Sequence, residues 1–145
     1  MKKIIKGKVY DTETAKELGS YSNTPYRSDF HYYEETMYRK KTGEFFIYGE
    51  GNAASKYARS VAMHETAPGE AIRPLTFQEA QEWAEMHLDA EDYADIFGEP
   101  AEDDSAVQFH AYIRSDLVEK LKRRAASQGK SLRDTLEEIL SESLS

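Results

Sequence analysis

The sequence contains no cysteine, so disulfide bonds, thiolate catalysis and cysteine-based zinc sites are excluded. It also has no uninterrupted apolar run near the roughly 20 residues that a membrane-spanning helix needs. The first ten residues carry lysines but no apolar stretch after them, so no secretory signal peptide is expected. We therefore predict a cytoplasmic protein with no membrane partner.

Positive charge is missing from the middle of the chain. Residues 74–113 contain eleven Asp and Glu and no Lys or Arg, whereas residues 1–73 and 114–145 are each close to neutral. The net charge of -8 therefore comes from one segment. A charge asymmetry of this kind carries information about binding partners rather than about the fold.

Signatures of catalysis are missing as well. No two of the four histidines (His31, His64, His87 and His110) have the His-x-x-x-His spacing of a metal site. The segment Gly49–Gly51 lacks the third glycine and the lysine of a phosphate-binding loop, and no Gly-x-Ser-x-Gly motif occurs. We therefore predict that the protein is not an enzyme and has no catalytic residue, metal site or cofactor.

Several segments of the N-terminal part have strand patterns. Residues 1–10 and 33–49 carry the clearest ones, and the second predicts a hairpin that turns at Lys41–Gly43. Residues 20–32 are rich in turn-forming residues and are predicted to be a loop. Residues 63–74 are also predicted as loop, with an edge strand at Ala71–Arg73.

Four short helices are predicted in the same part of the chain, and three of them have candidate caps, the first at Asp11 or Thr12. Thr76 and Glu79 form a capping-box pattern, and Asp89 with Asp92 predicts the start of the helix that follows. The predicted helices cover residues 14–18, 52–62, 77–88 and 90–97. Residues 1–98 are therefore predicted to be an α+β domain, a small antiparallel sheet with flanking helices.

A different pattern begins after residue 98. Residues 99–104 hold four acids and a proline and predict an acidic linker. Residues 105–145 predict a module with a strand at Val107–Ile113 and two helices that are separated by Gly129. The predicted helix caps are Ser115 or Asp116 for the first helix and Ser131 for the second.

One strand and two helices cannot bury a core alone, because the module is too short. The single strand would also leave two unpaired edges. A two-fold dimer that pairs the strand with its own copy solves both problems, so we expect a homodimer. The residues expected at its interface are Phe109, Ala111, Ile113, Leu117, Leu121, Leu136 and Ile139.

This C-terminal module resembles the ribbon-helix-helix family of the Arc and MetJ type. The resemblance spans residues 106–140 and rests on Leu117, Leu121, Ala125, Gly129, Ser131 and Leu132. It implies that strand residues enter the DNA major groove and that the second helix holds a phosphate. The implied DNA-binding residues are Gln108, His110, Tyr112, Lys130 and Ser131. Because the three strand residues carry no formal charge, binding of promoter DNA and dimerisation alone stay open as alternatives.

Two segments of the N-terminal part resemble anti-CRISPR proteins of phages and other mobile elements from Gram-positive bacteria. They are the opening MKKIIKGKVYDTETAKELG and the hairpin TMYRKKTGEFFIYGEG at Thr36–Gly51. The resemblance implies an inhibitor of a CRISPR effector nuclease, of type II or another type, in the cytoplasm of a bacterial host. The alternative is a ribbon-helix-helix transcriptional regulator that represses its own promoter.

The acidic segment is the first candidate surface for such an inhibitor. An array of carboxylates without compensating cations is able to mimic a phosphate backbone and occupy a basic nucleic-acid channel. The alternative is a solvated helix face that only keeps the protein soluble. The candidate partner-binding residues are Glu79, Glu82, Glu85, Asp89, Glu91, Asp92 and Asp95.

The predicted hairpin is a second candidate surface. It interleaves aromatic and basic residues, a pattern that suits single-stranded DNA or RNA through stacking and phosphate contacts. The alternative is that its aromatic residues form the core face of a sheet and its lysines protect a turn. The residues concerned are Tyr38, Arg39, Lys40, Lys41, Phe45, Phe46 and Tyr48.

Overall fold

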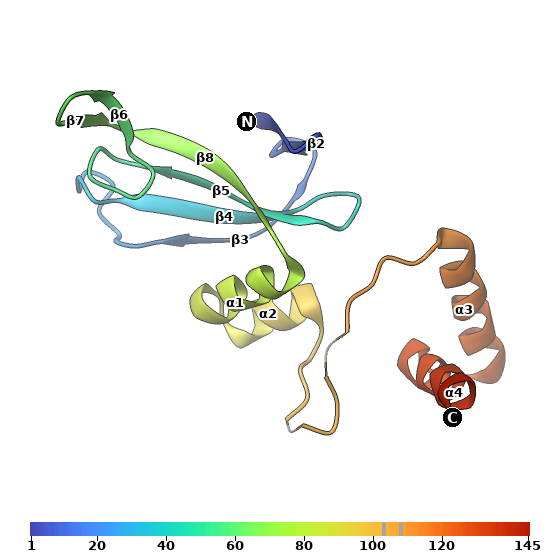
Figure 1. Ribbon diagram of the computed structural model, residues 1–145. Helices are drawn as coiled ribbons and strands as arrows, with labels where there is room; N and C mark the ends of the chain where they lie inside the picture. Colours follow the sequence, from blue (N-terminus) through green and yellow to red (C-terminus); the bar gives the residue numbers. More distant parts are fainter. Residues whose placement is uncertain (103, 108) are drawn as a thin grey trace. The chain divides into compact units, whose positions relative to one another are not determined.

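The computed structural model describes residues 1–102, 104–107 and 109–145 (Figure 1). The chain forms two compact units, Met1–Gln108 and Phe109–Ser145. In the described residues, the first unit contains antiparallel sheets and two helices, and the second contains two helices. The predicted α+β class is therefore confirmed.

The largest sheet of the first unit contains, in spatial order, β3 (Lys16–Ser22), β4 (Tyr33–Arg39), β5 (Phe45–Gly51) and β8 (Gly69–Leu75). All neighbouring strands are antiparallel. β4 and β5 pair along their whole length, from Tyr33 opposite Gly51 to Arg39 opposite Phe45. This pairing confirms the predicted hairpin, and β8 confirms and lengthens the predicted edge strand.

Two short hairpins accompany this sheet: β1 (Lys2–Ile5) with β2 (Lys8–Asp11), and β6 (Arg59–Ala62) with β7 (Glu65–Ala67). Lys6 and Gly7 have φ values of 51° and 79°. Both central residues of this two-residue turn are therefore left-handed, as in a type I′ hairpin turn, and Gly7 adopts this conformation without steric cost. Tyr10 of β2 packs edge-on against Phe46, with ring centroids 5.5 Å apart. The β1–β2 hairpin thereby packs on one face of the main sheet.

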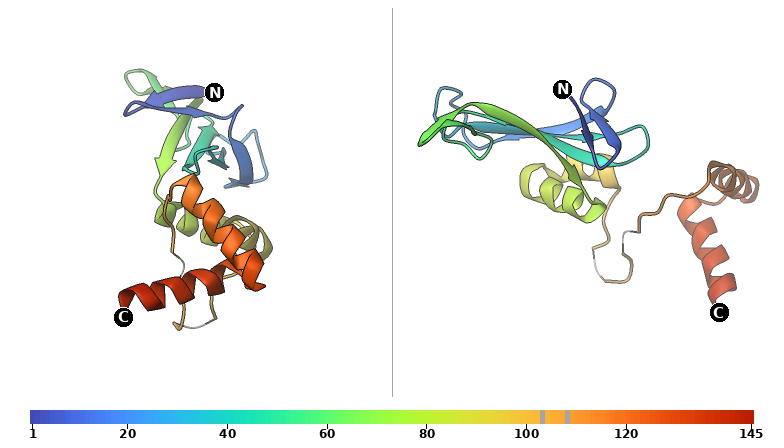
Figure 2. Two further views of the ribbon diagram at one scale, coloured as in Figure 1. Left: turned by 90° about the vertical axis from the view of Figure 1, so that its right-hand side faces the viewer. Right: turned by 45° about the horizontal axis from the view of Figure 1, so that its top comes forward.

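The opposite face of the sheet is covered by α1 (Phe77–His87) and α2 (Ala90–Phe97) (Figures 1 and 2). The predicted capping box is present: the Thr76 hydroxyl accepts from the Glu79 N–H, and the Glu79 carboxylate accepts from the Thr76 N–H. Asp89 accepts from the Asp92 N–H at 2.8 Å. Both predicted helix starts are therefore confirmed.

The main core lies between the sheet and α1. Met37, Phe45 and Ile47 occupy alternate positions on β4 and β5, so their side chains point to the same face. There they are buried against Trp83 and Ala84 of α1. Removal of these apolar side chains from water is the main source of stability in the first unit.

The helix predicted over Thr14–Leu18 is wrong. This part of the chain instead runs into β3, which pairs with β4. A Cβ on Gly19 would lie 2.8 Å from a methyl group of Leu88, so β3 lies close to the segment between α1 and α2. The sheet pairing therefore overrides the local capping signal at Asp11 and Thr12.

The helix predicted over residues 52–62 is also wrong. Residues 52–58 form turns, in which Ser55 and Ala58 donate backbone hydrogen bonds to residues three positions earlier, and β6 follows. The Tyr57 ring lies directly over Gly49, since a Cβ at that position would stand 1.9 Å from the ring carbon Cζ. This packing needs a residue without a side chain on β5.

The second unit contains α3 (Ser115–Gln128) and α4 (Leu132–Leu144). Gly129 ends α3 in a left-handed conformation with φ of 64°, and Ser131 caps α4 by accepting from the Asp134 N–H at 3.0 Å. Both features agree with the sequence. The predicted cap of α3 is wrong, because the helix begins at Ser115 without a side-chain cap.

The predicted ribbon falls on Val107–Ile113. Of these residues, Gln108 lies outside the described part of the chain, and the others form no helix or strand in the single chain. A ribbon of the predicted kind is made by two chains, so it belongs to the proposal below. The expected linker, residues 99–104, has no helix or strand in its described residues.

We predict that Gly49→Ala destabilises the first unit by about 2 kcal/mol, because the new methyl group collides with the Tyr57 ring. Urea unfolding followed by the fluorescence of Trp83, the single tryptophan, measures the effect. In a Tyr57→Ala background the same change should cost less than about 0.5 kcal/mol. An equal cost in both backgrounds would contradict this account of Gly49.

Candidate partner-binding surfaces

The structure places all seven acids that the sequence singles out within the first unit, on α1 and α2 and at the residue that precedes α2. All seven side chains are exposed. Two of them also stabilise helix starts. Glu79 and Asp89 are the caps described above, and the hydrogen bonds from Thr76 hold the pKa of the Glu79 carboxyl below its ordinary value. Their role at the helix starts accounts for Glu79 and Asp89, so no binding partner is needed to explain these two acids.

The other five are Glu82, Glu85, Glu91, Asp92 and Asp95. Within the described residues, none of them forms an ion pair. Glu82 accepts a hydrogen bond from Gln78 at 3.1 Å, a neutral neighbour one helical turn earlier. These five residues thus form an uncompensated array of negative charge, which we call the acidic helix surface.

A buried carboxylate lies beneath α1, at Glu35 of β4. Its side chain is only 1% exposed. Trp83 Nε1 donates to one carboxylate oxygen at 3.0 Å, while the Tyr57 hydroxyl and the Lys56 ammonium reach the other, the latter at 2.8 Å. Glu35 therefore joins three segments: the sheet, helix α1 and the turns at residues 52–58.

The hydrogen bonds around Glu35 keep it ionised. Burial is the largest single influence and raises its pKa, but the donors Lys56, Tyr57 and Trp83 and the charge of Lys56 together bring the pKa below its ordinary value. Beside it, burial lowers the pKa of His87, whose ring stacks on Tyr21 at 3.9 Å. The cluster is a satisfied polar network, since in the described residues no buried side-chain polar atom lacks a partner.

Glu35 is not among the residues that the sequence pattern singles out. A signal was present, because Glu35 and Met37 lie two residues apart on a strand and must point to the same face. An acid at such an inward position needs partners from elsewhere in the fold. Those partners, Tyr57 and Trp83, are 22 and 48 residues away, so the sequence does not identify them.

The other face of the sheet carries a row of three carboxylates. Glu34, Glu50 and Glu70 lie directly opposite one another on β4, β5 and β8. The Tyr48 hydroxyl donates to Glu70 at 2.5 Å and lies 3.2 Å from Glu50, and the Tyr32 hydroxyl donates to Glu34 at 2.7 Å. Like charges directly opposite each other destabilise a sheet, so this glutamate row opposes folding.

A cavity of about 660 Å³ adjoins this row. It is open to solvent, and its walls come from β5, β8, β6 and the loops at the end of the sheet. The lining includes both acids and bases. The residues are Arg27, Tyr32, Glu50, Gly51, Asn52, Arg59, Pro68, Gly69 and Glu70.

The two phenylalanines of the β4–β5 hairpin are not accessible to nucleic-acid bases. Phe45 and Phe46 are buried in the two cores, and Tyr38 stacks on Phe46 at 5.3 Å. Lys40 pairs with Glu44 at 3.3 Å and lies 4.4 Å from the centre of the Tyr10 ring. The hypothesis that bases stack on Phe45 and Phe46 is therefore wrong. For these two residues, the alternative that they form the core face of a sheet is confirmed.

The second unit leaves much apolar surface exposed. Phe109 is 82% exposed, and Leu117, Leu132 and Leu140 each remain more than two-fifths exposed. In its described residues, only Ala125 and Thr135 are buried. Of the other predicted interface residues, Ala111 and Ile113 are exposed, and Leu121, Leu136 and Ile139 are half-buried.

The predicted phosphate-binding residues of this unit already have partners within the chain. Lys130 forms an ion pair with Glu138, and the Ser131 hydroxyl caps α4. Both remain on the surface, so the pair is easily exchanged for a phosphate contact. The rings of His110 and Tyr112 contact each other edge-on at 4.9 Å.

Comparisons with known proteins do not assign this chain. No protein family, curated protein or solved structure matches it. Within the described ranges, no three acids or histidines are grouped so that they could hold a metal ion. In the same ranges, no helix has both the length and the apolar character to cross a membrane.

We predict that Glu35→Gln lowers the free energy of unfolding by about 2 kcal/mol at pH 7, because the charge-assisted hydrogen bonds are weakened. In the folded protein the pKa of Glu35 is below its ordinary value. The ionised carboxylate therefore contributes its full stabilisation at pH values above the ordinary pKa of a glutamate, and this contribution is lost as the pH falls through the folded-state pKa. The difference in the free energy of unfolding between the wild type and Glu35→Gln should therefore become smaller as the pH is lowered from 7 to 3. A difference that does not change with pH would contradict this assignment.

Proposed function

We propose that the protein is an anti-CRISPR inhibitor that binds a CRISPR effector nuclease complex and blocks nucleic-acid loading or cleavage. The acidic helix surface is the observation that carries this proposal. Its five carboxylates are exposed on two consecutive helices and have no ion-pair partner in the described residues. Effector nucleases hold nucleic acid in positively charged channels, which such a surface is suited to enter.

The resemblance of the opening segment and the β4–β5 hairpin to anti-CRISPR proteins supports the same function. In the structure these segments comprise β1, β2, the start of β3 and most of the two central strands, β4 and β5. They build the scaffold beneath the acidic helix surface rather than the surface itself. On this proposal, the protein acts in the cytoplasm of a bacterial host, and the effector of a type II system is the first partner to test.

We further propose that the second unit forms a ribbon-helix-helix homodimer. The exposed apolar side chains of residues 109–117 and of α4 support this, because isolated helical hairpins of this size do not bury a stable core. Two copies would pair their ribbons and cover these side chains. The dimer would present two inhibitor surfaces to the target and raise its effective affinity.

A transcriptional regulator is the second candidate function. It is favoured by the same apolar surface and by the exposure of His110 and Tyr112, two of the proposed base-reading residues. On this proposal the dimer binds promoter DNA through Gln108, His110 and Tyr112, with Lys130 and Ser131 at the phosphates. The two functions can occur in one chain, since they use different units.

We predict that Glu82→Lys, Glu85→Lys and Asp92→Lys together weaken effector binding at least about tenfold and abolish inhibition of target cleavage, because they reverse the acidic helix surface. Glu13→Lys, Glu17→Lys and Glu142→Lys form the matched control, with the same change in net charge at exposed positions. Normal inhibition by the first triple variant, or equal loss in both, would rule out the acidic-surface mechanism. A variant with His110→Ala and Tyr112→Ala that still inhibits target cleavage would show that inhibition does not require promoter binding.

We predict that light scattering gives a mass of about 33 kDa, twice the 16.6 kDa of one chain. Leu117→Asp with Leu140→Asp should return the mass to that of one chain, because two charges would enter the apolar interface. Ser127→Asp with Ser141→Asp adds the same charge at exposed polar positions and should keep the dimer. A wild-type protein with the mass of a single chain is the result that excludes the dimer.

A further inference from the structure

Three segments gather at one end of the main sheet, away from the β4–β5 turn (Figures 1 and 2). They are residues 23–32, residues 52–58 and the β6–β7 hairpin, and we call them the distal loops. The Ala54 N–H donates to the Phe30 carbonyl at 2.8 Å, and the Thr66 hydroxyl donates to the Ala53 carbonyl at 2.5 Å. The three segments are thus joined into one surface.

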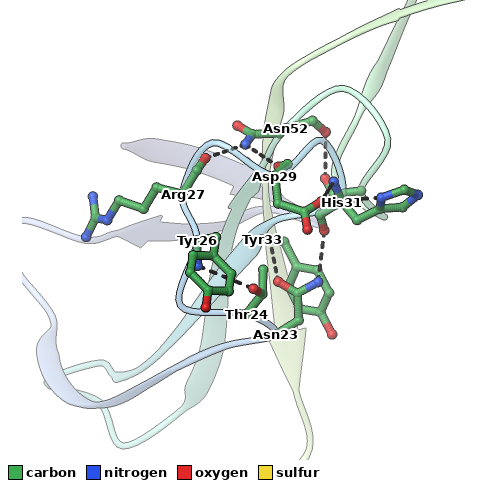
Figure 3. A network of polar contacts seen from close by, with 9 residues as sticks. Asn23, Thr24, Tyr26, Arg27, Asp29, His31, Tyr33 and Asn52 are labelled. Carbon is green, nitrogen blue, oxygen red and sulfur yellow. Dashed lines mark hydrogen bonds and ion pairs between the residues drawn. The ribbon is translucent and has the colours of Figure 1, made fainter.

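Side-chain hydrogen bonds fix the shape of the longest of these loops (Figure 3). Asn52 Nδ2 donates to the carbonyls of Arg27 and Asp29 at 2.7 and 2.8 Å. Asn23 Nδ2 donates to the His31 carbonyl at 2.9 Å. Two asparagines thereby hold the middle and the end of the loop, so its conformation is largely set before any partner binds.

This ordered surface exposes large apolar side chains. Tyr26 is 69% exposed, Phe30 is 72% exposed, and Met63, at the turn of the β6–β7 hairpin, is 86% exposed. Aromatic residues and methionine are enriched in protein–protein interfaces, and aromatic side chains often dominate their binding energy. Because the loop is already ordered, little conformational entropy remains to be lost on binding. Neither core of the first unit includes these three residues.

The charge beside these side chains indicates the kind of partner. Arg27 lines the 660 Å³ cavity together with Glu50 and Glu70. Arg59 uses its Nε to bind the Pro68 carbonyl at 3.2 Å, and Arg27 lies 3.9 Å from Glu34. Within the described residues, the ion pair of Arg27 with Glu34 is the only one that the glutamate row makes, so Glu50 and Glu70 have no ion-pair partner there. A further guanidinium or ammonium group would relieve the repulsion along the row, whereas a phosphate would add to it.

We propose that the distal loops and the glutamate row bind an arginine-bearing segment of a partner protein. The aromatic side chains of Tyr26 and Phe30 would lie against guanidinium groups, which favour aromatic faces, and the carboxylates would accept their hydrogen bonds. This inference rests on the proposed function, because it takes the effector nuclease as the partner. It adds a second contact surface, distinct from the acidic helix surface.

The first experiment measures binding of the full-length protein to a type II effector nuclease, with and without guide RNA. Tyr26→Ala with Phe30→Ala should weaken binding at least about tenfold. Ile4→Ala with Val9→Ala is the matched control, because it removes two exposed apolar side chains from the β1–β2 hairpin and should leave binding unchanged. Wild-type affinity in the Tyr26 and Phe30 variant would overturn the inference while leaving the proposed function intact.

A second experiment does not depend on the effector. A nona-arginine peptide is titrated into the full-length protein, and backbone amide shifts are followed by NMR. The shifts should include residues 26–32, and Glu50→Gln with Glu70→Gln should weaken binding at least about fivefold. Glu13→Gln with Glu17→Gln makes the same change in charge elsewhere and should have less than a twofold effect. Equal effects in the two variants would overturn the inference.

A third arm tests nucleic acid with a single-stranded oligouridine. No shift in residues 26–32 is expected, and saturable binding there would overturn the choice of a protein partner. If wild type fails to bind the effector in every form, the proposed function is wrong. In that case, the titration with the nona-arginine peptide alone tests whether the distal loops bind an arginine-bearing segment.

Discussion

The buried carboxylate of Glu35 is the interaction that ties the main sheet of the first unit to parts of both proposed contact surfaces. One side chain on β4 accepts from Trp83 of α1 and from Lys56 and Tyr57 of the turns after β5. It therefore fixes α1, one of the two helices that carry the acidic helix surface, and a loop that belongs to the distal loops. A buried charge of this kind is tolerated only when its hydrogen bonds are complete, which makes the arrangement specific as well as stable. Part of the geometry of both proposed contact surfaces therefore depends on the hydrogen bonds of Glu35.

Negative charge is distributed in the first unit in a way that folding alone does not favour. Glu79 and Asp89 contribute to folding as helix caps, but the five acids of the acidic helix surface have no ion-pair partner in the described residues. The glutamate row places like charges opposite one another on three strands. Charges that cost stability are commonly retained for binding. A basic partner would make both arrangements favourable in the complex.

Local signals in the sequence predicted much of the fold. The hairpin of β4 and β5, the capping box at Thr76 and the caps at Asp89 and Ser131 all depend on residues within a few positions of one another. The helix predicted over residues 14–18 failed because pairing of β3 with β4 and contact of Gly19 with Leu88 decide that segment. The failure over residues 52–62 has the same origin, since Tyr57 packs on Gly49.

For the candidate surfaces too, features that depend on nearby residues were predicted from the sequence, and features that depend on long-range contacts were not. The seven acids were predicted because charge along a helix is visible in the sequence, and the structure places them exposed on α1, α2 and the residue before α2. Glu35, the glutamate row and the distal loops were not predicted, because each depends on residues that only the sheet register and the long-range hydrogen bonds bring together. For the glutamate row, the register of β4, β5 and β8 is the missing information.

Hydrogen–deuterium exchange of the protein, alone and with a type II effector nuclease, tests the central claim that the first unit makes the contact. The account predicts that the effector slows exchange in residues 26–32 and 77–97, while α3 and α4 exchange as in the protein without effector. Slowed exchange confined to residues 109–145, or no change anywhere in the first unit, would contradict it.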